Sequence, residues 1–188
     1  MIEPARVAAI LLAAGRSERF GSDKLLAPLA GKPVALHAAR RLAEIGTRWR
    51  IAICREESPL VDGLAAFGFE VLVNRDPSRG LSSSLALAIE RAEATGAEAA
   101  LVALGDMPFL SAAHLPALLA AFDADRAPVV ASAHDGTAMP PALFARSYFV
   151  RLREGEGDRG GRALLAGAML VEADAAELAD IDRPEDIR

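Results

Sequence analysis

Residues 7–24 read VAAILLAAGRSERFGSDK, an uninterrupted apolar run followed by a loop that contains two arginines and a lysine. An apolar run of this kind is typical of a strand that is covered on both faces, as in a parallel sheet between two layers of helices. We therefore predict a buried strand over residues 7–12. The loop leaves the carboxyl end of that strand, which is where ligands bind in open α/β sheets.

Strand and helix patterns alternate along the rest of the chain. Short apolar runs predict further strands over residues 49–54, 69–73, 99–104, 128–133 and 169–172. The segments between them predict helices over residues 33–44, 59–67, 82–94, 115–122 and 162–166. Repeated βα units form a mostly parallel sheet with helices on both faces, so we expect an α/β fold, a Rossmann-like three-layer sandwich. No linker or internal repeat divides the chain, and we expect a single domain over residues 1–188.

The composition excludes several classes of protein. Of the 188 residues, 52% are hydrophobic and 25% are charged, as in a globular protein. The net charge of −5 disfavours a nucleic-acid backbone as the main partner, because proteins that bind one usually carry positive charge. Cys54 is the only cysteine, so the chain has no intrachain disulfide and no cysteine-based zinc site; the apolar context of Cys54 predicts a packing role.

The chain carries no pattern that predicts export or membrane insertion. Residues 1–4 read MIEP and lead to the first strand without a basic start or a small-residue cleavage site. The longest uncharged apolar run, residues 7–14, is too short to cross a bilayer. We therefore expect a cytoplasmic protein without a membrane partner.

The loop after the first strand has the composition of an anion-binding site. Small side chains over residues 13–15 let backbone N–H groups approach a phosphate closely. Arg16, Arg19 and Lys24 add positive charge where a polyphosphate would lie. Taken alone, the loop is also compatible with a plain connection that carries surface arginines.

Two common phosphate-binding motifs are absent from this loop. The dinucleotide fingerprint G-x-G-x-x-G fails because no glycine lies between Gly15 and Gly21. The P-loop pattern G-x-x-x-x-G-K-[ST] fails because Gly21 is followed by Ser22 and not by lysine. The missing dinucleotide fingerprint disfavours a nicotinamide-dependent oxidoreductase.

The loop resembles the signature of a known family. Residues 12–15 together with Ser17, Arg19, Gly21 and Lys24 match L-A-x-G-x-S-x-R-x-G-x-x-K of the sugar-nucleotide-type nucleotidyltransferases, and residues 25–33 resemble the continuation of that signature. Within this superfamily the chain resembles the molybdenum cofactor cytidylyltransferases and guanylyltransferases. The resemblance implies the nucleotide-diphospho-sugar transferase fold. It also implies an NTP site, with phosphates on Arg19 and Lys24, that is lined by Leu12, Ala13, Ala14, Gly15, Arg16 and Ser17.

Two acidic segments resemble the metal-binding segments of that family. Asp106 follows the strand predicted over residues 99–104, and Mg²⁺ prefers oxygen ligands of this kind. Residues 180–186 read DIDRPED and resemble the family's D-I-D-T-P-E-D segment, which supplies a second acid. Asp182 is the first choice for that acid and Asp180 the second. Alternatively, Asp106 caps a turn and Asp182 caps a short helix, although capping and metal binding are compatible.

The start of the helix predicted over residues 82–94 is rich in serine. Gly80, Ser82 and Ser83 resemble part of a G-x-S-S-S-L segment of the cytidylyltransferases, in which the serines and the adjoining backbone contact the base. Serines at a helix start also act as caps in any protein. The resemblance therefore implies nucleotide contacts for these residues, and capping is the alternative.

The acceptor side of the family has two segments, of which the chain matches one. Residues 157–162 read GDRGGR and resemble the family's G-D-x-G-A-R segment, which implies that Asp158, Gly160 and Arg162 bind the acceptor. The family's Gly-His-Pro sequence has no counterpart with histidine, since Met139 precedes Pro140 here. Molybdopterin is therefore the acceptor that the resemblance implies, and the missing histidine leaves the acceptor open.

Ala14 bears on the choice of nucleotide. Guanine-using relatives tend to have L-A-G-G at this place and cytosine-using relatives L-A-A-G. A methyl group crowds a purine more than a pyrimidine, and one methyl-sized difference supports about 1–3 kcal/mol of discrimination. We therefore expect CTP, with GTP as the alternative.

These features together predict a reaction. We expect Mg²⁺-dependent transfer of CMP from CTP to a phosphorylated acceptor such as molybdopterin, with release of pyrophosphate and with Lys24, Arg19 and Asp106 as catalytic residues. An accessory protein of molybdoenzyme maturation is a further possible partner. The alternative from another class is a non-catalytic nucleotide-binding or chaperone module, and the presence of both Asp106 and Asp182 disfavours it.

Overall fold

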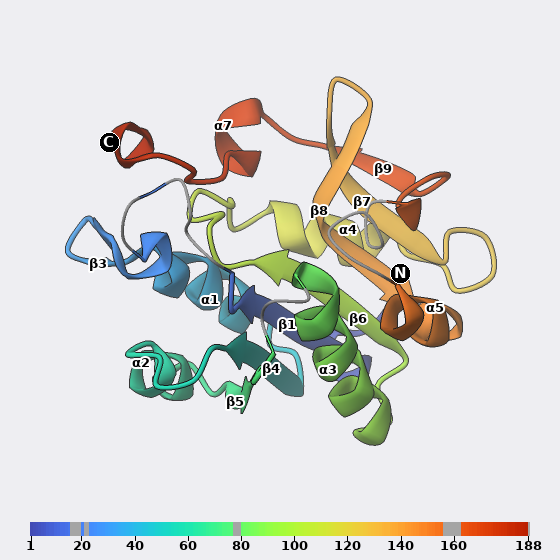
Figure 1. Ribbon diagram of the computed structural model, residues 1–188. Helices are drawn as coiled ribbons and strands as arrows, with labels where there is room; N and C mark the ends of the chain where they lie inside the picture. Colours follow the sequence, from blue (N-terminus) through green and yellow to red (C-terminus); the bar gives the residue numbers. More distant parts are fainter. Residues whose placement is uncertain (16–19, 21–22, 77–79, 156–162, 188) are drawn as a thin grey trace.

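The fold is built on one central sheet (Figure 1). The computed structural model describes residues 1–15, 20, 23–76, 80–155 and 163–187. In the order of the sheet, the strands are β5 (Glu70–Val73), β4 (Trp49–Cys54), β1 (Val7–Ala13), β6 (Ala99–Leu104), β8 (Thr137–Ala145), β7 (Val129–His134) and β9 (Met169–Glu172). A separate hairpin pairs β2 (Pro28–Leu29) with β3 (Lys32–Pro33).

β1 lies inside the sheet and is buried along its whole length. Its residues enter two different cores in alternation: Leu11 packs into the first core, whereas Ile10 and Leu12 pack into the second. Side chains alternate between the two faces of a strand, so a continuous apolar run is what burial on both faces requires. This explains why the run at residues 7–12 shows no polar alternation.

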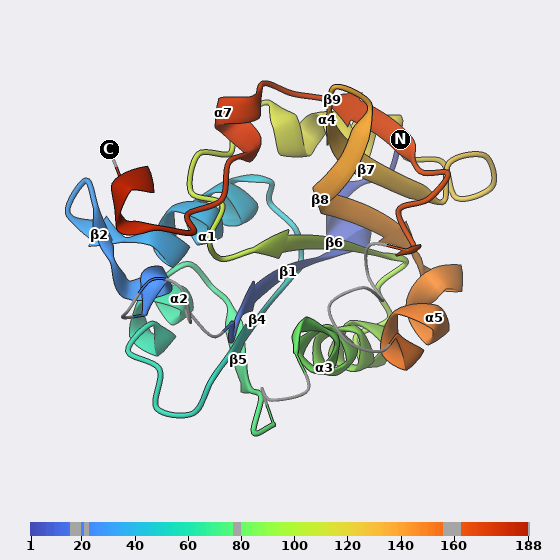
Figure 2. The same cartoon turned by 45° about the horizontal axis from the view of Figure 1, so that its top comes forward.

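Helices cover both faces of the sheet (Figure 2). The first core, on the side of Leu11, is completed by α1 (Val34–Glu44), α2 (Val61–Ala66), α4 (His114–Ala121) and α7 (Ala175–Leu178). The second core is completed by α3 (Leu81–Ala94) and α5 (Phe149–Glu154). Short 3-10 turns occur at η1 (Pro4–Arg6), η2 (Lys24–Leu26), η4 (Arg146–Tyr148) and η5 (Pro184–Asp186). The three-layer α/β fold is thereby confirmed.

All the strands predicted from the sequence are present, within one residue of their predicted ends. The helices predicted over residues 33–44, 59–67, 82–94 and 115–122 correspond to α1, α2, α3 and α4. The helix predicted over residues 162–166 begins outside the described residues. No helix of the described part of the chain is both long enough and apolar enough to cross a membrane.

β8 is the strand of the central sheet that the sequence pattern does not predict. Pro140 and Pro141 lie inside it, and proline lacks the N–H group that a β-ladder uses. The pairing with β7 shifts register between Ala131 and Ser132, so the two prolines lie opposite the irregularity and need no ladder bond. β8 runs antiparallel to both of its neighbours, which makes the sheet mixed.

The remaining strands of the central sheet place their carboxyl ends at one edge. β5, β4, β1 and β6 are parallel in succession. β7 and β9 are parallel to each other and, across the antiparallel β8, point the same way as β6. The segments that follow β1, β5 and β6 therefore meet at this carboxyl edge, where the candidate site residues lie.

Candidate functional site

Asp106 lies at the carboxyl edge, two residues after the end of β6. The N–H of Gly105 donates to the carbonyl of Leu12 at 2.9 Å, which extends the contact between β6 and β1 beyond the ladder. A Cβ at Gly105 would lie 3.3 Å from that carbonyl oxygen, so glycine permits the close approach of the two chains. This contact fixes Asp106 beside the carboxyl end of β1.

The C-terminal acids are brought to Asp106 by the residue between them. Ile181 is completely buried in a small apolar cluster. Its N–H donates to the carbonyl of Asp106 at 2.9 Å. Asp180 and Asp182 flank this anchor, and one carboxylate oxygen of each lies within 4.8 Å of one from Asp106. The structure thus brings together the three acids that the sequence predicts as metal ligands.

These carboxylates fit a hard divalent cation. Asp106 Oδ1 is buried and has no hydrogen-bond partner among the described residues. A buried carboxylate oxygen without a partner is costly, which indicates a place for a ligand. A donor set made only of oxygens suits Mg²⁺ or Mn²⁺ better than zinc, which favours histidine and cysteine.

Asp180 is the acid whose ionisation is opposed by its surroundings. Burial, followed by the negative charges of Asp106 and Asp182, raises the pKa of the Asp180 carboxyl above its usual value. Like charges at close range disfavour each other's ionised form. A cation among the three carboxylates would reverse that effect, since its charge favours the ionised form of each acid.

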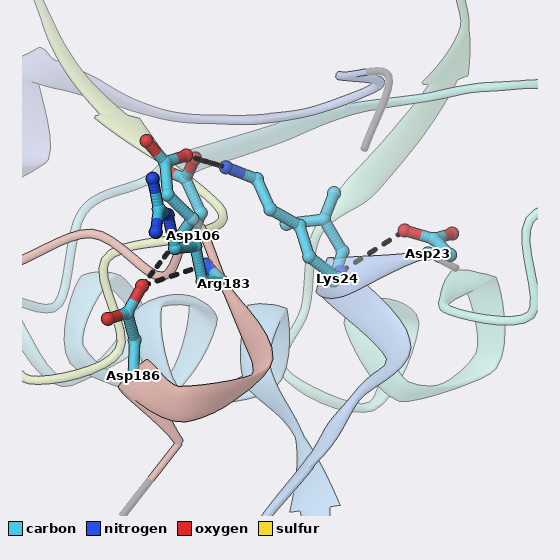
Figure 3. Close-up of polar contacts among 7 residues, drawn as sticks. Asp23, Lys24, Asp106, Arg183 and Asp186 are labelled. Atoms are coloured by element: carbon cyan, nitrogen blue, oxygen red, sulfur yellow. Dashed lines mark hydrogen bonds and ion pairs between the residues drawn. The ribbon is translucent and has the colours of Figure 1, made fainter. Parts of the chain in front are cut away.

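Lys24 directs its ammonium group between two of the acids, and Figure 3 shows it reaching Asp106. Nζ lies 2.7 Å from Oδ2 of Asp106 and 2.9 Å from Oδ1 of Asp182. Burial by itself lowers the pKa of the ammonium group, but the hydrogen bonds and charges of Asp106 and Asp182 outweigh burial, and the pKa is raised. The lysine is therefore charged and offsets part of the negative charge of the site.

The segment that carries Lys24 is held by polar and apolar contacts. Asp23 caps η2, because its Oδ1 accepts from the N–H of Leu25 at 3.1 Å. The other carboxylate oxygen of Asp23 pairs with Arg55, which directly follows β4. The side chain of Leu25 is buried in the first core. Asp23 and Arg55 were not among the residues predicted from the sequence, although an aspartate before a helical turn is a capping signal.

The N-cap position of the C-terminal turn is occupied by Arg183 and not by Asp182. η5 begins after Arg183, and the carboxylate of Asp186 accepts from the N–H groups of Asp182 and Arg183 at 3.0 and 2.8 Å (Figure 3). The carboxylate of Asp182 contacts Lys24 instead. Asp182 is therefore not the N-cap residue of η5, and Asp186 supplies the bonds that fix its backbone.

The serine-rich segment begins where α3 starts. Gly80 precedes the helix with φ 78° and ψ −166°, a conformation that favours glycine. The hydroxyl of Ser83 accepts from Nδ2 of Asn74 at 2.8 Å and donates to the carbonyl of Gly80 at 2.9 Å. Asn74, Ser82 and Ser83 line a pocket of about 380 Å³. Base contacts of Gly80, Ser82 and Ser83 stay predictions, and the hydroxyl of Ser83 is already bonded within the protein.

Asn74 is a residue of this edge that sequence analysis missed. It directly follows β5, and its side chain joins the end of that strand to the start of α3. The signal in the sequence was a single amide after the apolar run that ends at Val73. An asparagine in that position is also typical of an ordinary turn, so the pattern alone did not distinguish the two roles.

The residues at the end of β1 differ in how they are able to meet a nucleotide. Leu12, Ala13 and Ala14 are buried, which leaves mainly their backbone groups for a ligand. Ala14 is only 5% exposed and belongs to the second core together with Leu85 of α3. Its methyl group is therefore packed against protein, which weakens the steric argument for a pyrimidine. At Gly15 an added Cβ would meet no described atom within 4 Å.

Comparison with known proteins agrees with this geometry. Residues 9–176 match the family described as the MobA-like NTP transferase domain. The chain belongs to the MobA-like NTP transferases. Membership confirms the resemblance found in the first loop and makes the chain a member of a nucleotidyltransferase family.

Two relatives match the NTP transferase over most of its length. The purine catabolism protein PucB of Bacillus subtilis is 30% identical over 191 residues, which cover 94% of this chain and 92% of PucB. A molybdenum cofactor guanylyltransferase of Rhodobacter capsulatus is also 30% identical, over 97% of this chain and 93% of that protein. The structure of Rv0371c from Mycobacterium tuberculosis has the same fold, with a TM-score of 0.80 at 24% identity over 96% of this chain and 94% of that one.

Several residues predicted for the NTP transferase site lie outside the described residues. They are Arg16, Ser17 and Arg19 of the first loop and Asp158, Gly160 and Arg162 of the acceptor segment. Their roles stay predictions.

His134, the histidine nearest in sequence to the missing Gly-His-Pro, has its Nδ1 3.2 Å from the carbonyl of Ala173.

Proposed function

We propose that this NTP transferase moves the nucleotidyl group of an NTP onto a phosphorylated acceptor, with a divalent cation held by Asp106, Asp180 and Asp182. The observation that carries the proposal is the convergence of these carboxylates with Lys24 at the carboxyl edge, with one oxygen of Asp106 left without a described partner. A module that only bound nucleotides would need positive charge for the phosphates. Three clustered acids add a place for a metal ion that assists transfer, and this supports transfer over binding alone.

The chemistry follows from charge. An oxygen of the acceptor phosphate attacks the α-phosphorus of the NTP, and the bond to the leaving pyrophosphate breaks. A bound Mg²⁺ would neutralise phosphate charge and stabilise the departing pyrophosphate. Lys24, held in place by Asp23 and Leu25, contributes a fixed positive charge at the same edge. The attacking phosphate is already ionised, so the chain needs no general base.

Two nucleotides are candidates for this site. CTP is proposed from Ala14, which takes the place of the first glycine in the L-A-G-G of guanine-using relatives. GTP is the second candidate, and the name of the Rhodobacter capsulatus relative, a guanylyltransferase, favours it. The packing of Ala14 into the second core reduces the weight of the steric argument, so the two nucleotides need a direct comparison.

Molybdopterin is the proposed acceptor. The name of the Rhodobacter capsulatus relative supports it, whereas PucB is named for purine catabolism. Residues 136–141, which resemble the segment with the family's Gly-His-Pro, contain no histidine, so the acceptor side of this chain differs from that pattern. An accessory protein of molybdoenzyme maturation remains a predicted partner.

One assay tests nucleotide and acceptor together. Pyrophosphate release is measured with each of the four common NTPs, with and without molybdopterin, in the presence of Mg²⁺. Release that requires molybdopterin and prefers CTP is expected. Preference for GTP would replace CTP and leave the reaction type intact. Binding of an NTP without turnover for any acceptor tested would favour the non-catalytic nucleotide-binding module instead.

A further inference from the structure

Asn74 connects the sheet to the first turn of α3. The residue is buried, with 6% of its surface exposed, and its N–H donates to the carbonyl of Cys54 at 2.8 Å, at the end of β4. Its Nδ2 donates to the hydroxyl oxygens of Ser83 and Ser84 at 2.8 and 2.9 Å. Its Oδ1 accepts from the N–H of Asp76 at 2.9 Å. One buried amide therefore ties together the end of β5, the turn after it and the start of the helix.

The hydroxyl of Ser83 transmits this constraint to Gly80. Because the hydroxyl accepts from Asn74, its own hydrogen is directed to a carbonyl, that of Gly80 at 2.9 Å or that of Asp76 at 3.2 Å. Gly80 has a positive φ that other residues adopt only with strain. The amide and the hydroxyl thus fix the backbone conformation immediately before α3.

The first turn of α3 lies beside the start of the proposed nucleotide site. α3 packs against β1, and Leu85 of α3 belongs to the same buried cluster as Ala14, which directly follows β1. Asn74 also lines the 380 Å³ pocket together with Ser82. A shift of the helix start would therefore change the surface that meets the nucleotide.

We propose that Asn74 is a positioning residue for the nucleotide. It holds Gly80 and the first turn of α3 in the geometry that receives the NTP, and it acts through Ser83 and Ser84. This inference rests on the proposed function. Loss of Asn74 should weaken NTP binding and leave the chemical step, which depends on Asp106, nearly unchanged.

The central experiment replaces Asn74 and separates binding from turnover. Asn74→Ala is expected to raise the Kd and KM for the NTP about tenfold, the effect of one or two lost hydrogen bonds. The kcat is expected to stay within about twofold of the wild type. Calorimetric titration with CTP and with GTP, each with Mg²⁺, gives the Kd, and pyrophosphate release gives KM and kcat. Asn74→Asp keeps the acceptor for Asp76 and removes the donor to both serines, so it answers the same question if Asn74→Ala fails to fold.

A second buried network provides a matched control. Ser132 is completely buried, and its hydroxyl donates to the carbonyl of Pro141 at 2.7 Å. Ser132→Ala removes the buried hydrogen bonds of this hydroxyl to Pro141 and His114, neither of which belongs to α3, so it is expected to lower the Tm and leave the NTP Kd unchanged. A purely structural role predicts the same result for Asn74→Ala, namely a lower Tm with an unchanged Kd, and that result would overturn the inference.

A double-mutant cycle tests whether the amide acts through the serines. In a Ser83→Ala, Ser84→Ala background, Asn74→Ala is expected to change the Kd little further, because its partners are already gone. Additive effects would overturn the inference. A wild-type chain that binds neither CTP nor GTP would overturn both the proposed function and this inference. Normal binding and turnover by Asn74→Ala, beside an active wild type, would overturn the inference alone.

Discussion

Two polar groups lie at the carboxyl edge of the sheet, and they are built in opposite ways. The charged cluster joins segments far apart in the sequence and consists of Lys24, Asp106, Asp180 and Asp182. The amide network joins neighbouring elements and consists of Asn74, Ser83 and Ser84. Charge in the first is only partly offset by one lysine, and an oxygen of Asp106 lacks a described partner. In the second, both ends of the amide and the hydroxyl of Ser83 are bonded.

The difference separates a site that awaits a ligand from one that supports it. Three carboxylates and one ammonium group leave a surplus of negative charge, which a divalent cation would offset. A neutral network whose groups are bonded to each other gains nothing from a ligand and instead makes the backbone rigid. Substitutions in the charged cluster should therefore change the chemistry, and substitutions in the amide network should change binding geometry.

The largest effect is expected from Asp106→Asn. The change keeps the size of the side chain and removes the charge that a cation and Lys24 both need, so pyrophosphate release should fall on the order of 10³-fold. Circular dichroism and Tm should show that the fold survives. Asp62→Asn, at an exposed position of α2, is the matched control and should keep full activity. Substantial Mg²⁺-dependent turnover by Asp106→Asn would contradict the metal assignment.

Lys24→Ala is expected to have two opposite effects. Loss of a positioned charge should lower kcat/KM for the NTP on the order of 10²-fold. Without NTP, the same change leaves Asp106 and Asp182 without the ammonium that lies between them. A cation no longer competes with this ammonium group, so the affinity for Mn²⁺ should rise about tenfold. Electron paramagnetic resonance titration with Mn²⁺, in the absence of NTP, measures this affinity.

Lys32→Ala is the matched control for that prediction, because Lys32 is exposed on β3 and is no part of the charged cluster. It should change neither the NTP kinetics nor the affinity for Mn²⁺. If Lys24→Ala bound Mn²⁺ no more tightly than the wild type, the ammonium and the cation would not share a position. Unchanged NTP kinetics in Lys24→Ala would mean that the loop after β1 is misassigned.

The sequence predicts the parts of the fold in which local pattern and burial agree. β1 and β6 are continuous apolar runs, and both are buried almost throughout. β8 is not predicted, because Pro140 and Pro141 argue against a strand unless the register shift opposite them is known. That shift is a property of the pairing between two strands, which no single segment reveals.

The same limit applies to the candidate site. Asp106 and Asp182 are predicted because each stands in a segment that resembles a family segment. The contact of Lys24 with Asp182 spans 158 positions of the chain and follows only from the way Ile181 is anchored to the backbone of Asp106. The hydroxyl of Ser83 is bonded within the protein because Asn74 donates to it. The sequence pattern gave no sign of this contact. The residue types of the site could therefore be predicted from the sequence, but their hydrogen-bond and ion-pair partners could not.

A third polar group offers the smallest effect and a further contrast with the amide network. His114 of α4 and Ser132 of β7 are both buried, and Nε2 of the histidine lies 2.7 Å from the serine hydroxyl. Because that hydroxyl donates to Pro141, the histidine ring is the donor. Burial lowers the pKa of His114 below its ordinary value of 6.5, and the negative charge of Glu177 offsets part of this effect. This network is satisfied like the amide network, but it contains a group that titrates.

The sign of the pH effect follows from that lowered pKa. The unfolded chain takes up a proton on His114 near pH ~6.5, whereas the folded chain does so only at lower pH. The stabilisation by the neutral, buried ring is complete above the unfolded-state pKa of ~6.5 and is lost as the pH falls through the folded-state pKa. Between about pH 7.5 and about pH 5.5, the wild type should therefore lose a few degrees more of Tm than His114→Gln, which keeps a donor and cannot titrate. Every other titrating group is common to the two proteins, so equal losses of Tm would show that the buried ring contributes nothing. Asn74→Ala, which changes no titrating group, should leave the pH dependence of Tm unaltered.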